Sequence, residues 1–205
     1  MDLLLIRHGE NEYTRTGKLA GQIAGVHLNA AGQAQAQALV ARLAEAPIKA
    51  IYSSPLDRAL ETAQPLAEAR KLEARICEGL REVDFGQWTG KSLRRLARTK
   101  LWREVQRQPS RVQFPEGETF LAAQMRAVQG VEQIAAAHPK SLVAAVTHAD
   151  VIKLVVAHYL GQPLDLFQRL VIGTASVTLL HLGQGQPALV KLNDTGALDR
   201  PGHKA

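Results

Sequence analysis

The chain has 205 residues, of which 46% are hydrophobic, enough for one sizeable core, and we expect a single domain over residues 1–205. The formal charge is +6, but aromatic residues make up only 4% of the chain and offer little surface for stacking bases, so no nucleic-acid partner is expected. The single cysteine, Cys77, excludes an intrachain disulfide and any multi-cysteine metal site, and it fits a reducing compartment. No apolar stretch reaches membrane-span length and the opening run is too short for a signal peptide, so we expect a cytoplasmic protein without a membrane partner.

The first predicted element is a buried strand over residues 3–6, an uncharged apolar run that ends at Arg7, His8 and Gly9. The carboxyl ends of strands are where ligands bind in open α/β sheets, and a glycine there lets the backbone turn tightly. Neutral imidazole is a competent nucleophile, and an adjacent arginine offers donors that match phosphate oxygens. The tripeptide therefore indicates that His8 is the nucleophile of a phosphoryl-transfer enzyme, although by itself it fits a polar strand end equally well.

Residues 14–27 show neither a helical nor a strand period and are expected to form a loop across this site. Within it, Gly21 and Gln22 are placed to present backbone or amide donors to a ligand. Residues 29–46 then predict a helix that Asn29 caps.

A second short strand is predicted at residues 50–53. The next residues have the pattern of a helix start, with Ser54 as the cap and Pro55 at the first helical position. Arg58 then lies in the first turn, where unpaired N–H groups and the helix dipole add to its attraction for an anion. The segment alone also fits an ordinary exposed arginine.

A third strand is expected near residues 75–77, followed by a glycine-bounded loop at 80–90. Glu82 and Asp84 lie there among apolar and aromatic neighbours, which makes both candidates for a general acid whose pKa is raised by burial. Asp84 also fits a simple loop residue.

Residues 91–110 predict a basic helical stretch. Its local cluster is interpreted first as a solvated helix face, second as an attractor of anionic substrates and third as a nucleic-acid site. The cluster consists of Arg94, Arg95, Arg98 and Lys100.

The next helix is predicted to bury one apolar stripe in the core. A strand at residues 142–147 follows it and leads into His148 and a helix at 151–160; the pair 177–182 and 188–192 predicts a terminal hairpin, and the tail from Thr195 is expected to be loose. The stripe consists of Leu121, Met125, Val128, Val131 and Ile134.

A histidine or arginine thus follows each of three strands. Helical crossovers between these strands predict parallel pairing, which would bring the four side chains to one edge of one sheet. This coincidence carries more weight than any single motif. The four residues are Arg7, His8, Arg58 and His148.

These motifs resemble the histidine phosphatase superfamily, also called phosphoglycerate mutase-like, over nearly the whole chain. The resemblance implies a three-layer α/β/α sandwich whose central sheet is mostly parallel with an antiparallel edge. The similar stretches are Arg7-His8-Gly9-Glu10 (signature tripeptide and acidic follower), 28–32 (helix start), 53–63 (second arginine block), 80–90 (segment of the acid) and 146–148 (second histidine).

The resemblance also implies roles. His8 becomes transiently phosphorylated, while Arg7, Arg58 and His148 bind the phosphoryl group. Glu82 protonates the leaving group and then activates water, and neither a metal nor a cofactor is needed.

Two departures from the family bear on this site. Thr14 stands where many members have a phosphate-contacting Asn, and the nearby amide of Asn11 is a candidate replacement for that donor. Asp150, two residues after His148, is a third candidate acid by comparison with the phytase branch, although it also fits a cap of the following helix.

Three functions remain open. The first is a metal-independent phosphomonoesterase that acts through phosphohistidine on a small phosphorylated metabolite, because the chain is short of the insertions that cover a mutase site. The second is a cofactor-dependent phosphoglycerate mutase or related phosphomutase, and the third is a non-catalytic phosphate-binding member. A homodimer is also left open.

Overall fold

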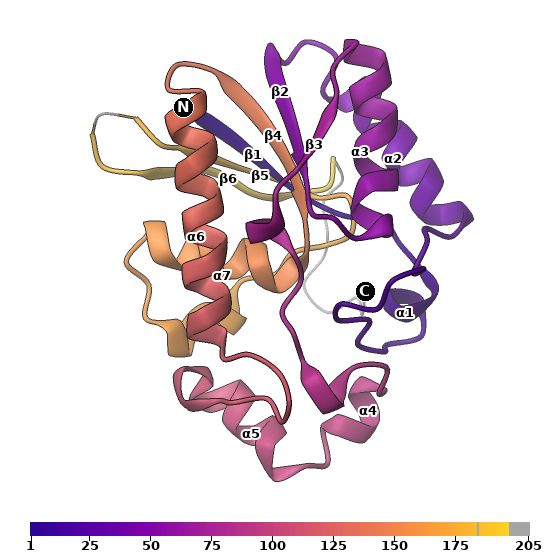
Figure 1. Ribbon diagram of the computed structural model, residues 1–205, viewed down its shortest axis with the longest axis vertical. Coiled ribbons are helices and arrows are strands. Elements are labelled where there is room, and N and C mark those ends of the chain that lie inside the picture. The colour runs from indigo at the N-terminus through magenta and orange to yellow at the C-terminus, as the bar shows by residue number, and fades with distance from the viewer. Residues whose placement is uncertain (184, 197–205) are drawn as a thin grey trace.

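The computed structural model describes residues 1–183 and 185–196. Its sheet has six strands in the order β3-β2-β4-β1-β5-β6 (Figure 1). The first four strands in this order are mutually parallel, and the last two form an antiparallel edge, as the sequence predicted. The strands are β1 (Asp2–Arg7), β2 (Ile48–Ser53), β3 (Ala74–Ile76), β4 (Leu142–Thr147), β5 (Val177–His181) and β6 (Ala188–Asp194).

Both faces of the sheet are covered by helices (Figure 1). In β1, Leu3 and Leu5 pack into the core beneath α6 and α7, while Leu4 and Ile6 pack into the core beneath α2 and α3. A strand buried on both sides has no polar face, which explains its uncharged sequence. These helices are α2 (Ala30–Arg42), α3 (Asp57–Arg70), α6 (Phe120–Ala137) and α7 (Ala149–Tyr159).

The strand register brings the predicted site residues together. Arg7 at the end of β1 is paired with Thr147 at the end of β4, and Ser53 at the end of β2 is paired with Val146. The residues that follow these three strands therefore leave the sheet at one edge, as expected for parallel strands.

Helix α3 begins at Asp57 rather than at Pro55, so the predicted capping role of Ser54 is wrong. The reason is that the Ser54 hydroxyl lies 2.8 Å from Nε2 of His148, which draws it toward the sheet edge. Arg58 nevertheless lies in the first turn, as predicted.

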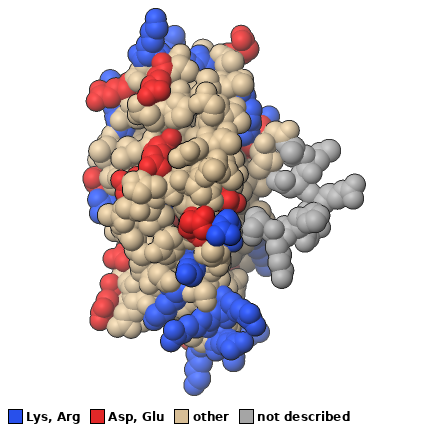
Figure 2. All heavy atoms as spheres, turned by 90° about the vertical axis from the view of Figure 1, so that its right-hand side faces the viewer, with Lys and Arg blue, Asp and Glu red and all other residues tan. Residues whose placement is uncertain are grey.

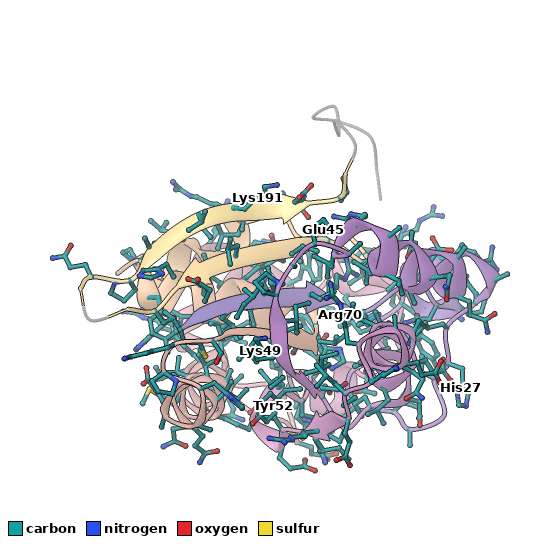
Figure 3. All side chains as sticks on the ribbon, turned by 90° about the horizontal axis from the view of Figure 1, so that it is seen from above. His27, Glu45, Lys49, Tyr52, Arg70 and Lys191 are labelled. Carbon is teal, nitrogen blue, oxygen red and sulfur yellow. The ribbon has the colours of Figure 1, made fainter. Side chains whose placement is uncertain are left out.

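Helix α2 ends at Arg42, four residues before the predicted end at Ala46. The carbonyl oxygens of Leu43 and Ala44, directly after this helix end, accept from Arg70 at the end of α3. Arg70 is labelled in Figure 3. The contact joins the carboxyl ends of the two helices on this face of the sheet.

Helix α6 buries a face that differs from the predicted stripe. The last three positions of that stripe are buried, but Leu121 and Met125 are 53% and 48% exposed. Phe120, Ala123 and Ala127 take the contact positions in the first turns, and the small alanines let this part of the helix lie close to its neighbours.

Between β3 and α6 the chain leaves the sandwich as a lobe, residues 85–117 (Figure 1). Where the sequence predicted one helical stretch over 91–110, the structure has α4 (Leu93–Leu96), α5 (Lys100–Arg107) and a 3₁₀ turn at Pro109–Arg111. The hydroxyl groups of Ser92 and Thr99 cap α4 and α5 separately, which divides the stretch in two.

The lobe closes on itself at its base. The amide of Glu118 donates to the carbonyl of Asp84 at 3.0 Å, and the amide of Asp84 donates to the Glu118 carboxylate at 2.9 Å. A Cβ on Gly86 would lie 2.1 Å from the carbonyl oxygen of Pro115, and one on Gly117 would lie 2.4 Å from that of Asp84. The two chain segments of this neck can therefore approach so closely only because both positions are glycine.

Positive charge gathers on the lobe, over α4 and α5 (Figure 2). Residues 91–111 contain eight Lys or Arg and one Glu, a formal charge of +7, so the remaining chain carries only −1 of the total of +6. The four residues of the predicted cluster are all exposed, as the interpretation of a solvated helix face requires.

The terminal hairpin is present, with β6 extending to Asp194. Most of the tail expected to be loose, from residue 197 onward, lies outside the described residues. Within the described part of the chain, none of the helices combines the length and apolar character needed to cross a membrane.

Candidate active site

His8 follows β1 and is only 4% exposed. Its Nδ1 lies 2.7 Å from the carbonyl oxygen of Gly9, which can only accept, so Nδ1 carries the hydrogen and Nε2 holds the free lone pair. Burial, followed by the charges of Arg58 and Arg7, holds the pKa of His8 well below 6.5. The ring is therefore neutral and has the tautomer that a nucleophile requires.

Two arginines flank this ring, the buried Arg58 and the half-buried Arg7, each held by a backbone carbonyl. Nη2 of Arg58 donates to Gly21 at 2.7 Å, and Nη1 of Arg7 donates to Ile172 at 2.7 Å. Nε and Nη1 of Arg58 and Nε of Arg7 are buried and have no hydrogen-bond partner among residues 1–183 and 185–196. Buried charged donors without partners are costly, and an anion would satisfy them.

Asn11 adds a neutral donor to the same cavity. Its Oδ1 accepts from the amide of Thr14 at 3.0 Å and caps α1 (Glu12–Arg15), while its Nδ2 is buried without a partner in the described chain. The Thr14 hydroxyl is occupied by the backbone of Asn11. The arrangement favours the side-chain amide of Asn11 over the hydroxyl of Thr14 as a donor to phosphate.

His148 follows β4 and lies against both Arg58 and His8. Its Nδ1 is 3.3 Å from Nη2 of Arg58, which can only donate, so Nδ1 accepts and Nε2–H donates to the hydroxyl of Ser54 at 2.8 Å. The ring centroids of His148 and His8 are 5.2 Å apart. Burial and then the Arg58 charge lower the pKa of His148 well below 6.5, so both rings are neutral.

Ser54 is a site residue that the sequence reasoning missed. Its hydroxyl fixes the tautomer of His148. One sequence signal could have indicated this role, because Ser54 follows its strand directly, just as His8 and His148 follow theirs. The resemblance of this segment to a helix start concealed that role.

Glu82 supplies a carboxyl group beside this cluster. Its Oε2 lies 3.9 Å from Nδ1 of His148, and its Oε1 accepts from the amide of Val83 at 2.9 Å. Burial and the charge of Asp150 raise the pKa of Glu82 to about 7, against the opposing effect of Arg58. Near neutral pH the group is therefore able both to donate and to accept a proton.

Comparison with known proteins identifies the family. The description "Histidine phosphatase superfamily (branch 1)" belongs to a family model that matches residues 3–195. The chain belongs to this superfamily. It is accordingly a phosphoric monoester hydrolase with the phosphoglycerate mutase-like fold.

Three relatives illustrate the similarity. Phosphoserine phosphatase 1 of Hydrogenobacter thermophilus is 29% identical over 195 residues, covering 94% of this chain and 92% of that protein. The structure of a mycobacterial glucosyl-3-phosphoglycerate phosphatase in complex with VO3 has a TM-score of 0.84 at 26% identity, covering 94% of this chain and 98% of that one. A mutant phosphoserine phosphatase from Entamoeba histolytica, in complex with phosphoserine, also has a TM-score of 0.84 at 26% identity, covering 95% and 97% of the two chains.

In this histidine phosphatase, Gly21 and Gln22 are directed at protein groups. The Gly21 carbonyl accepts from Arg58, and Nε2 of Gln22 donates to the backbone carbonyl of Glu82 at 2.8 Å. Both contacts position other site residues. Direct binding of phosphate by Gly21 and Gln22 stays a prediction.

The other two carboxylates occupy different settings. Asp84 accepts from the amide of Gly86 at 2.9 Å and belongs to the neck of the lobe. Asp150 lines the cavity, but its Oδ1 accepts from Lys153 at 3.0 Å. Of the three candidates, Glu82 is the one with a carboxyl oxygen beside His148.

The cluster opens into a cavity of about 570 Å³. Its lining includes Arg7, His8, Asn11, Arg58 and Glu82, and we call this group of residues the phosphate end. Among the described residues, no three His, Cys, Asp or Glu side chains are grouped so that they could hold a metal ion.

Proposed function

We propose that the protein is a metal-independent phosphomonoesterase that forms a phosphohistidine on His8 and acts on a small phosphorylated metabolite. The observation that carries the proposal is the set of buried N–H groups on Arg7, Arg58 and Asn11, which have no partner in the described chain and line the same cavity as His8. A phosphate ester supplies the anionic oxygens that these donors require, and places its phosphorus beside a neutral imidazole.

In the first step, Nε2 of His8 forms a bond to phosphorus as the ester P–O bond breaks. The leaving oxygen takes the proton of Glu82 and departs as an alcohol. Charge on the equatorial oxygens is stabilised by Arg7 and Arg58, whose positions are fixed before the substrate arrives.

In the second step, Glu82 is a carboxylate and takes a proton from water. That water attacks phosphorus, the P–N bond to His8 breaks, and inorganic phosphate leaves. The Gly9 carbonyl keeps the His8 proton on Nδ1 throughout, so the same nitrogen serves every cycle. Both steps balance without a metal ion, and we expect activity to survive chelation with EDTA.

Replacing Glu82 by glutamine is expected to have a strong leaving-group dependence. Turnover of glycerol phosphate, whose alkoxide must be protonated, should fall by about 10² to 10⁴-fold, whereas p-nitrophenyl phosphate should lose much less. Asp84→Asn is the matched control and should show no such difference. Asp150→Asn removes a charge that raises the pKa of Glu82, and its leaving-group dependence should be much smaller than that of Glu82→Gln. If Asp150→Asn has the dependence and Glu82→Gln lacks it, Asp150 is the acid.

The pH profile follows from the same assignment. Because the pKa of Glu82 is about 7 and the protonated form is the general acid, kcat/KM for poor leaving groups should fall as pH rises above about 7. The fall should vanish in Glu82→Gln. Since the pKa of His8 lies well below 6.5, protonation of the nucleophile should lower activity only at more acidic pH.

A phosphatase is distinguished from a phosphomutase by measuring two products of the same reaction. With 3-phosphoglycerate and a trace of the 2,3-bisphosphate, we expect inorganic phosphate to appear faster than 2-phosphoglycerate. Transfer back to substrate requires that water be excluded from the phosphohistidine, and the cavity holds an acid poised to activate water. Rapid isomerisation with negligible phosphate release would establish the mutase instead.

A further inference from the structure

The cavity collects most of the aromatic side chains of the protein. The chain has two Trp, three Tyr and four Phe, nine aromatic residues in all. Of the 205 residues, 27 line the cavity, so an even spread would place one or two aromatic residues there. Six are present: Tyr13, Phe85, Trp88, Trp102, Phe114 and Phe120.

Most of these side chains form one wall, which the lobe provides. The rings of Trp88 and Trp102 are stacked with centroids 6.0 Å apart and an angle of 24° between their planes. Trp88 also meets Phe114 at 5.3 Å. Trp88, Phe114 and Val105 are buried within the wall. Leu93 is exposed and Trp102 is half-buried, so these two side chains present the surface that is free for contact.

The wall is coupled to the loop that leads from the nucleophile. The amide of Leu19 donates to the carbonyl of Lys91 at 3.0 Å, and the amide of Gly90 donates to Leu19 at 2.7 Å. Leu19 itself lines the cavity and packs against the apolar cluster of the lobe. The apolar surface is therefore continuous from the lobe to the residues beside the phosphate end.

Most charged lining residues beyond the phosphate end are held by neighbouring side chains, whereas Lys18 is exposed and its side chain has no such partner among the described residues. Nζ of Lys153 binds Asp150 at 3.0 Å and Gln168 at 3.2 Å, and Arg15 is paired with Glu12. Lys18 could meet the carboxylate of a doubly charged leaving group such as serine, but to bind the ammonium group the site would have to break one of these contacts. An apolar leaving group would displace water from the wall and leave the pairs intact.

We propose that the substrates of this site are phosphate monoesters of hydrophobic alcohols, with the alkyl or aryl body of the alcohol lying against the wall of Trp88 and Trp102. The inference rests on the phosphatase activity proposed above and specifies its leaving group. The phosphate occupies the end formed by Arg7, His8 and Arg58, and the carbon skeleton points toward the lobe.

The test is a series of n-alkyl phosphates from ethyl to octyl, each below its micelle concentration. Their leaving groups have nearly the same acidity, so the chemical step is constant and only the buried apolar area changes. We expect kcat/KM to rise with each added methylene by up to about fourfold, the ratio that full burial of one CH₂ provides. A flat or falling series, or a kcat/KM for phosphoserine as high as that for hexyl phosphate, would overturn the proposal.

Variants of the wall test whether the rise in kcat/KM per methylene comes from contact with these side chains. Trp102→Ala should reduce the increase per methylene, whereas Gln106→Leu, which adds apolar surface one turn further along α5, should steepen it. Leu121→Ala, at an exposed position outside the cavity, is the control and should leave the slope unchanged. If Trp102→Ala fails to fold, Gln106→Leu still decides, because an unchanged slope in that variant contradicts the proposal.

Hydrolysis of p-nitrophenyl phosphate by the unmodified protein separates this inference from the function on which it rests. If that ester and all alkyl phosphates are inert, both the phosphatase proposal and the inference fall. If p-nitrophenyl phosphate is hydrolysed but chain length has no effect, the phosphatase stands and the hydrophobic leaving group is wrong.

Discussion

Replacing His8 by alanine is expected to reduce turnover by at least about 10⁴-fold, because the variant loses the atom to which the phosphoryl group is transferred. With a ³²P-labelled substrate quenched in denaturant, the unmodified protein should carry a phosphoryl label that is stable in alkali and lost in acid. His8→Ala should carry none. The measurement is label per protein together with steady-state phosphate release.

His158→Ala is the matched control for this experiment, since His158 is exposed on α7 outside the cavity. That variant should retain both label and turnover. A label found on any residue other than His8, or normal turnover without a covalent intermediate, would contradict the mechanism.

Arg58→Met should lower kcat/KM by about 10³-fold or more while leaving the free energy of unfolding within about 1 kcal/mol of the original. The reason is that Arg58 is 1% exposed and buries two guanidinium nitrogens, Nε and Nη1, that find no partner in the described chain. Burial also lowers the pKa of Arg58, which shows that its charge is held at a cost. Methionine has a similar length and no charge, so the substitution removes that cost. This gain offsets the loss of the hydrogen bond to Gly21.

Phosphate binding gives a second measurement on the same variant. Because a ligand that binds only the folded state raises Tm, added phosphate should stabilise the unmodified protein and have a much smaller effect on Arg58→Met. Arg70→Met provides the opposite pattern: its carbonyl contacts join α2 and α3, so stability should fall while activity and the phosphate response remain. A loss of more than about 3 kcal/mol in Arg58→Met would show instead that Arg58 is mainly structural.

The parts of the site that could be predicted are those that local sequence determines. Apolar runs that stop at Arg7, at Ser53 and at Thr147 mark strand ends, and chain topology then places those ends at one edge. The parts that could not be predicted depend on partners far away in the chain. Ser54 was expected to cap a helix because its bond to His148, 94 residues away, has no local signature.

The same limit explains the other differences. The orientation of Gln22 is set by the Glu82 carbonyl, 60 residues further along, and not by its own loop. In α6, periodicity located an apolar face, but the choice between Leu121 and Ala123 as contact positions depends on how closely the neighbouring elements approach. Only the folded arrangement supplies that distance.

The neck formed by Asp84 and Glu118 makes the lobe an exchangeable unit. Its two ends are joined by a backbone hydrogen bond and by a bond from the Asp84 amide to the Glu118 carboxylate. A segment of different length or sequence between Gly86 and Gly117 would therefore change the loop-closure entropy of the fold only a little. His8, the two arginines and His148 all lie outside it, and Glu82 stands two residues before Asp84 at its base. If the lobe recognises the alcohol as proposed, evolution can replace it and keep the sheet edge that is proposed to hold the phosphate. A chimaera joined at these two glycines would then transfer one enzyme's preference to another.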